Sequence, residues 1–364
     1  MRDSIGSPTP FRNYSLQTFI LMFRKIFGVL LLATAAFAFG ACDKDNNEKR
    51  QPTPQPQPAP TEEVEPVRAE LTLAGGHFHG VAFHQDADAQ GITYKKAVQH
   101  LTFVRKGDTW ELEKGSADAF RVLSSRQYLY PYGLWIKYYD AKGQDITPLI
   151  AENGESRAHQ HFFVPSEVKP TFDGTAEKDD QIADSLLNYV YMDTNPTNGI
   201  LKSTTDKATG QTIPAAKLTG SKVVGQNALG DIFEPLNPIG MKGFFQFKKP
   251  RKSFVLTVTL FHFDGDAKFP GGKPSPFFAP TAGQLATGHR EVVLRVPFVV
   301  YASREETGDW ETLNAVPYAQ LRPAEQRLVL STARAYGISE ELATKDWFAH
   351  ILGEVDKESG ALWF

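Results

Sequence analysis

Hydrophobic and polar positions alternate through most of the chain after residue 67, and this pattern predicts β-strands. Ala69, Leu71 and Leu73 are separated by polar neighbours, which is the period of a half-buried strand. Turn-forming residues such as Lys106-Gly107-Asp108 lie between the runs. The predicted strands are 68–80, His100–Arg105, Thr109–Glu113, Gly133–Tyr139, His159–Val164, Phe254–Phe263 and Glu291–Tyr301. We therefore expect a mainly β fold of one or two antiparallel β-sandwich-like domains, with a C-terminal pair of short helices.

The strands fall into two blocks on either side of an irregular region. We expect a first β domain over 67–175, an irregular connecting region over 176–240 and a second β block over 241–305. Within the middle region, Ile182–Met192 fits a strand or a short helix. Each block has an aromatic strand, a glycine-containing loop and a strand that opens at a histidine. The blocks are either two copies of one sandwich domain or parts of a single domain.

The C-terminal segment, 306–364, has the pattern of helices. Pro323 suits the first position of a helix that ends at Gly337. Ser339 can cap a second helix that runs to about Val355. We expect the two helices to pack on a sheet.

A different pattern occupies the stretch near the N-terminus. Arg24-Lys25 precede an apolar run from Ile26 to Gly40, roughly 15 residues, which is typical of a signal-peptide core and short of the ~20 needed to span a bilayer. The small pair Gly40-Ala41 then precedes Cys42, the only cysteine of the chain. This order resembles the lipobox of bacterial lipoproteins. The resemblance covers about 20 residues, and no family is recognised for residues 67–364.

The resemblance implies that residues 1–41 are a signal peptide and that Cys42 carries a diacylglyceryl anchor as the mature N-terminus. The polar lead 1–21 is atypical before a signal, which suggests translation from Met22 and a lead that is not native. Asp43-Lys44-Asp45 resembles the export signal of Bacteroidetes-type surface lipoproteins and implies a lipid-anchored protein of the outer membrane, exposed at the cell surface. A single aspartate in that position is similar instead to the inner-membrane retention signal of enteric bacteria.

Composition narrows the classes of partner and chemistry. The segment 42–66 holds the lipidated Cys42 and a stretch, 46–66, that is rich in proline and glutamine. This stretch predicts an extended tether, which at ~3.1 Å per residue reaches up to ~60 Å. The net charge of -3 at pH 7 gives no large basic patch, so no nucleic-acid partner is expected. With Cys42 lipidated, no cysteine remains for disulfides, thiolate metal sites or a cysteine nucleophile.

Two His-x-His pairs are the main candidates for chemistry. They are His77 with His79 and His159 with His161, among nine histidines in the chain. Alternate residues of a strand point to the same face, so each pair presents two imidazoles that suit a borderline metal such as zinc or copper. If the strands that carry the pairs are neighbours, a four-histidine site results. The alternative is that the histidines are ordinary structural or solvated residues.

His84 is a further candidate ligand, with a condition attached. In an unbroken strand from residue 77, His84 would point away from His77. It joins the first pair only if Gly80 breaks or bulges the strand. Asp86 and Asp88 are nearby candidates for oxygen ligands.

These observations predict a surface-anchored lipoprotein that binds zinc or copper, with haem as the less favoured alternative. It would act in nutrient acquisition together with an outer-membrane transporter. The absence of thiolates favours zinc or Cu(II) over Cu(I). The rival hypothesis is a non-catalytic adhesion or glycan-binding β-sandwich without a metal. No enzyme is predicted, because the sequence has no phosphate-binding loop, no Gly-x-Ser-x-Gly elbow and no His-Glu-x-x-His motif.

Overall fold

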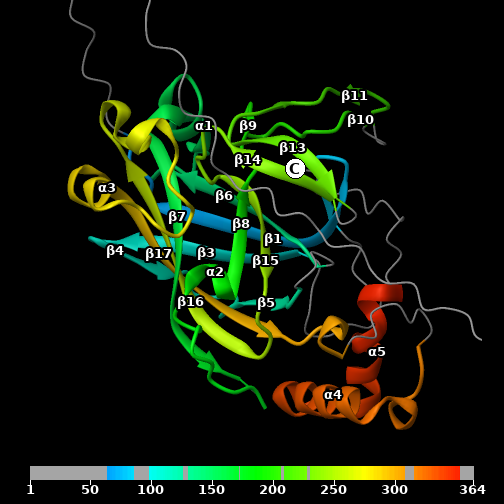
Figure 1. Cartoon of the computed structure of the whole chain (residues 1–364). Helices are drawn as coiled ribbons and strands as arrows, with labels where there is room; N and C mark the ends of the chain where they lie inside the picture. The colour runs from blue at the N-terminus through cyan, green and yellow to red at the C-terminus, as the bar shows by residue number, and fades with distance from the viewer. Residues whose placement is uncertain are drawn as a thin grey trace, which may run out of the picture. The chain divides into compact units, whose positions relative to one another are not determined.

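The computed structural model describes residues 64–85, 98–125, 130–171, 173–205, 209–227, 230–307 and 315–352 (Figure 1). The predicted signal peptide, Cys42 and most of the tether lie outside these residues, as do Asp86 and Asp88. The segment Glu62–Phe364 forms one compact unit. Among the described residues, no helix has the length and apolar content needed to cross a bilayer.

The larger sheet has seven antiparallel strands in the order β4-β3-β1-β6-β15-β8, with β2 paired to the end of β1. Its strands are β1 (Arg68–His79), β2 (Ala82–Gln85), β3 (Val98–Lys106), β4 (Thr109–Leu112), β6 (Tyr132–Tyr139), β8 (Leu187–Tyr191) and β15 (Lys242–Phe247). Hydrophobic residues on alternate positions of β1 and β6 are buried, as the sequence pattern predicts.

The smaller sheet has the order β5-β17-β16-β7, in which only the β5–β17 pair is parallel. Its strands are β5 (Phe120–Leu123), β7 (His159–Pro170), β16 (Lys252–His262) and β17 (His289–Tyr301). The long strand β16 alternates regularly between buried and half-buried residues. One face of this sheet therefore belongs to the core.

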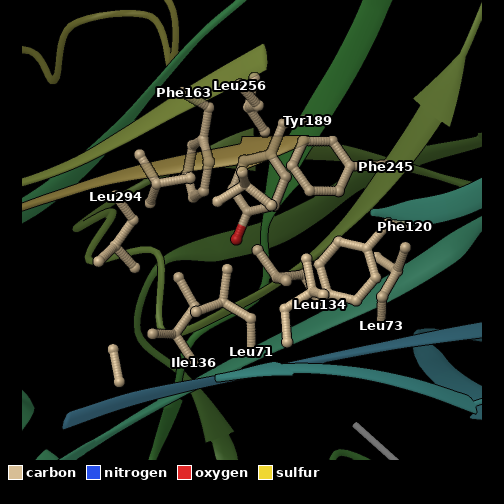
Figure 2. Close-up of a cluster of buried hydrophobic side chains, with 14 of the residues drawn as sticks. Leu71, Leu73, Phe120, Leu134, Ile136, Phe163, Tyr189, Phe245, Leu256 and Leu294 are labelled. Atoms are coloured by element: carbon tan, nitrogen blue, oxygen red, sulfur yellow. The ribbon is translucent and has the colours of Figure 1, made fainter. Parts of the chain in front are cut away.

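The two sheets share one hydrophobic core (Figure 2). Leu71 and Ile136 come from the larger sheet, and Phe163, Leu256 and Leu294 come from the smaller one. All five side chains are at most 1% exposed. Their burial removes apolar surface from water, which is the main favourable term in folding.

The two predicted β blocks are interleaved in this arrangement. Strand β15 follows residue 240 in the chain, yet it lies between β6 and β8 in the larger sheet. Strand β7 precedes residue 175, yet it pairs with β16 in the smaller sheet. The blocks therefore do not form two separate sandwiches, because each contributes strands to both sheets.

The region expected to be irregular contains short elements that sequence periodicity did not resolve. Ile182–Met192 holds both predicted alternatives, because helix α2 (Ala183–Leu186) leads directly into β8. Three short antiparallel pairs follow: β9 (Thr194–Asn195) with β12 (Lys217–Leu218), β10 (Thr204–Thr205) with β11 (Thr212–Ile213), and β13 (Ser221–Asn227) with β14 (Gly230–Pro235).

The remaining helices are α1 (Thr147–Ala151), α3 (Ala282–Thr287), α4 (Pro323–Tyr336) and α5 (Glu340–Leu352), with 3-10 turns that include η1 (Glu155–Arg157) and η2 (Gly265–Lys268). Helix α4 has the predicted bounds, and Gly337 ends it in the left-handed conformation, with φ of 62°. The Ser339 hydroxyl accepts a hydrogen bond from the Leu342 N–H at 3.1 Å, which caps α5 as predicted. The mainly β fold with C-terminal helices is thus confirmed.

Candidate metal centre

The two His-x-His pairs lie in different sheets. His77 and His79 end β1 of the larger sheet, whereas His159 and His161 begin β7 of the smaller sheet. His161 contacts Tyr138, which is paired with Ala69 in β1. His77 lies eight residues further along β1, roughly 26 Å away at about 3.3 Å per residue. The four-histidine site expected from neighbouring strands is therefore not formed.

The condition set for His84 is met. Gly80 has φ of 63° and lies in the turn between β1 and β2, so the chain reverses after His79. In the resulting hairpin His84 lies directly opposite His77, and the two imidazole centroids are 5.2 Å apart. The side chain of His79 lies outside the described residues.

His161 is a structural residue in this fold. It is fully buried, and its Nδ1 lies 2.8 Å from the Ile239 carbonyl oxygen, which can only accept a hydrogen bond. Nδ1 therefore carries a proton, and Nε2 accepts from the Tyr138 hydroxyl at 2.7 Å. Burial lowers the pKa of His161 to about 4. Both ring nitrogens are occupied, so this predicted ligand has no lone pair to offer a metal in this arrangement.

His159 is held differently, with one ring nitrogen directed at a carboxylate. The turn η1 directly precedes β7 and brings the Glu155 carbonyl oxygen to 3.0 Å from His159 Nδ1, which must therefore donate. On the other side of the ring, Nε2 lies 3.3 Å from Glu291 Oε2. A lone pair facing a carboxylate is repulsive. The geometry therefore calls for a cation between the two atoms, either a proton on Nε2 or a metal ion.

His262 completes the cluster from the neighbouring strand. It is paired in register with His159, and the two rings stack with centroids 4.6 Å apart. Its Nδ1 lies 3.5 Å from Glu291 Oε1, so one carboxylate contacts both imidazoles. The Glu155 carboxylate approaches from η1 on the other side of the His159 ring, with Oε2 3.9 Å from Nδ1. One ligand atom each of Glu155, His159 and His262 lies within 4.8 Å of the other two.

A β-bulge directs Glu291 toward the histidines. In the pairing of β16 with β17, Leu260 is opposite Val292, but the next residue, Phe261, is opposite Arg290. Glu291 is the extra residue of β17 and has no partner across the strand. A bulge of this kind re-aims a side chain, and bulges occur often beside functional sites. Here it brings a carboxylate to the edge of the core.

The charges of the cluster depend on one another. Burial opposes protonation of His159, but the facing Glu291 carboxylate outweighs it and raises the pKa of His159 above its ordinary value. Burial would raise the pKa of Glu291, yet His159, His262 and His289 together hold it below its ordinary value. The site therefore favours positive charge at His159 beside an ionised Glu291.

This donor set fits a borderline divalent metal. Zinc binds imidazole nitrogen at about 2.0–2.1 Å and carboxylate oxygen at about 2.0–2.2 Å, so the ligand atoms of a tetrahedral site lie about 3.4 Å apart. Each Glu291 contact taken by itself is close to this spacing: Oε2 lies 3.3 Å from His159 Nε2, and Oε1 lies 3.5 Å from His262 Nδ1. The spread of up to 4.8 Å among Glu155, His159 and His262 requires a contraction of up to about 1.4 Å on loading.

A second cluster of carboxylates is already paired with lysine side chains. Glu177, Asp179 and Asp180 have carboxylate oxygens within 4.8 Å of one another. Lys249 forms ion pairs with all three, and Lys252 lies 2.8 Å from Asp180. Two ammonium groups occupy the position that a metal would need, so this group is an ion-pair network that fastens the 173–182 loop to the strand β16.

Sequence reasoning selected His159 but not its partners in space. Glu155 precedes His159 by four residues, a spacing that could have drawn attention to it, whereas His262 and Glu291 join only through strand pairing and the bulge. Comparison with protein-family models, with curated proteins and with solved structures gives no match. The interpretation of the site therefore depends on its geometry.

Proposed function

We propose that this chain is a lipid-anchored lipoprotein of the bacterial surface that binds a borderline divalent metal, zinc foremost, in metal acquisition. The observation that carries the proposal is the cluster in which Glu291 bridges His159 and His262 beside Glu155. The anchoring part of the proposal depends on the lipobox around Cys42 and on the acidic residues that follow it. An outer-membrane transporter is the partner that such a role requires.

The chemistry of the donors supports zinc or Cu(II) over harder or softer ions. Imidazole suits zinc and copper, whereas calcium and magnesium prefer sites made only of oxygen ligands, and Cu(I) prefers thiolate or thioether. His159 is oriented by a hydrogen bond from Nδ1 to a backbone carbonyl. Metal-binding histidines commonly have this support, which fixes the tautomer and leaves Nε2 for the ion.

The test is a zinc titration of the purified full chain in detergent, in competition with a chromophoric chelator. The wild type is expected to bind about one zinc ion per chain, as four-ligand sites do. His262→Ala and Glu155→Gln should each weaken binding at least tenfold, because each removes a donor atom. Both side chains are partly exposed, so the fold is expected to survive, and thermal unfolding checks this.

The double variant His77→Ala/His79→Ala is the matched control, since it removes two histidines from the other sheet. It is expected to keep the affinity of the wild type. A wild type that binds neither zinc nor Cu(II) would refute the metal proposal and favour the adhesion or glycan-binding alternative. Loss of binding in the control, with binding kept in His262→Ala, would place the metal at the end of β1 instead.

A further inference from the structure

A third histidine lies in the same row of the smaller sheet. His262 of β16 is paired on one side with His159 of β7 and on the other side with His289 of β17. Residues directly opposite each other on antiparallel strands share a face, with Cβ atoms about 4.5–5.5 Å apart. His289 therefore stands beside His262, on the face that carries the candidate metal centre.

The three histidines differ in their access to solvent. The side chain of His159 is 6% exposed and that of His262 is 39% exposed, while His289 is an exposed residue. His289 is the first residue of β17 and directly follows Gly288, which ends helix α3. An exposed imidazole at the start of a strand can change rotamer without displacing packed neighbours.

The charge of the site favours recruitment of His289. Glu291, two residues further along β17, interacts electrostatically with His289 as well as with His159 and His262. A metal ion held between these groups would have one protected side, toward the core, and one open side, toward solvent. His289 is the histidine that stands on the open side.

We propose that His289 is the exchangeable ligand of this centre, which binds the ion from the solvent side and controls its release. This inference depends on the proposed metal-binding function and deepens it. The loaded site would combine imidazoles from three neighbouring strands with the carboxylates of Glu155 and Glu291, donor types that zinc and Cu(II) accept. His159 and His262 define where the ion sits, and His289 determines how readily it leaves.

The test compares His289→Ala with His100→Ala in the full chain. His100 is the matched control, because its side chain is also exposed, at 56%, and it lies on the larger sheet beside Thr72. Three measurements are made: zinc affinity, the rate of zinc loss to excess chelator, and the visible absorption of the Co²⁺-loaded protein. Four-coordinate Co²⁺ absorbs much more strongly than five- or six-coordinate Co²⁺, so this spectrum reports the ligand count.

His289→Ala is expected to bind zinc about tenfold or more weakly, to lose it correspondingly faster, and to change the Co²⁺ spectrum. His289→Asp should restore part of the affinity, because a carboxylate can also ligate. His100→Ala should match the wild type in all three measurements. Thermal unfolding of both metal-free variants should match the wild type, since both residues are exposed.

The outcomes separate this inference from the function on which it depends. If the wild type binds no metal, both the metal-binding function and the role of His289 are refuted. If His262→Ala loses zinc while His289→Ala keeps the affinity, release rate and Co²⁺ spectrum of the wild type, the centre stands and the role of His289 is refuted.

Discussion

Asp193 is the buried carboxylate on which the start of β15 depends, and Asp193→Asn should destabilise the fold strongly. Asp193 is a buried polar residue, and only 2% of its surface is exposed. Oδ2 accepts from the N–H groups of Ile239 and Gly240, at 3.0 and 2.9 Å. Oδ1 accepts from those of Met241 and Lys242, at 2.7 and 3.0 Å. Four successive backbone donors thus converge on one carboxylate.

These contacts determine the expected loss of stability. Asparagine has nearly the same shape but only one acceptor oxygen, so two buried N–H groups would face an amide NH₂. Each buried donor left without an acceptor costs ~1–3 kcal/mol. Burial raises the pKa of Asp193 although the N–H donors oppose it, so removing the charge recovers some desolvation energy. The net cost should be about 2–5 kcal/mol, a large part of the ~5–15 kcal/mol typical of native proteins.

The assay is urea unfolding followed by tryptophan fluorescence, which gives the midpoint and the slope m. Asp108→Asn is the control, because Asp108 lies in the exposed turn between β3 and β4. Asp193→Asn should lower the midpoint with little change in m, and the control should leave both unchanged. A loss of less than about 1 kcal/mol, equal to that of the control, would show that the four N–H groups find other acceptors.

Two further predictions concern buried basic groups. Burial lowers the pKa of Lys242 and of Lys268 to about 7, so between pH 7 and their ordinary pKa the unfolded chain binds more protons and stability should rise with pH. The urea midpoint of the wild type should therefore increase from pH 7 to pH 9, whereas that of Lys242→Met/Lys268→Met should depend less on pH. A wild-type midpoint that does not change with pH would contradict this. His161→Ala should cost about 2–4 kcal/mol, because it removes two buried hydrogen bonds and leaves a cavity, yet it should not change zinc affinity. An altered zinc affinity in that variant would return His161 to the set of ligands.

The strands and helices could largely be predicted, because local sequence determines them. Alternation in Phe254–Phe263 and Glu291–Tyr301 corresponds to β16 and β17, and Pro323 and Gly337 mark the ends of α4. Strand β5 was missed because three of its four residues are buried, so it lacks the regular alternation that marks the equally short strand β4. Sheet order also escaped prediction, since it depends on which strands meet and not on the pattern within one strand.

Only part of the candidate centre could be predicted from the sequence, for the same reason. The His-x-His spacing correctly indicates that His159 and His161 share a face, but the spacing does not show that His161 faces Tyr138 and a backbone carbonyl in the core. The partners His262 and Glu291 lie over a hundred residues away in sequence. They join His159 through the register of β7, β16 and β17, and Glu291 does so through a bulge that no short pattern announces.

Hydrogen bonds next to the cluster hold its backbone in place. Lys268, fully buried, donates to the Ser156 carbonyl oxygen at 2.5 Å and to Asn237 Oδ1 at 2.7 Å. The Asn237 side chain in turn donates to the Ser156 hydroxyl at 3.2 Å. These contacts fix η1, and η1 carries Glu155 against His159. Because η1 lies just before β7, these contacts hold the backbone next to His159. The protected side of the centre is therefore preorganised and loses little conformational entropy when a metal arrives, and only its exposed side has to move.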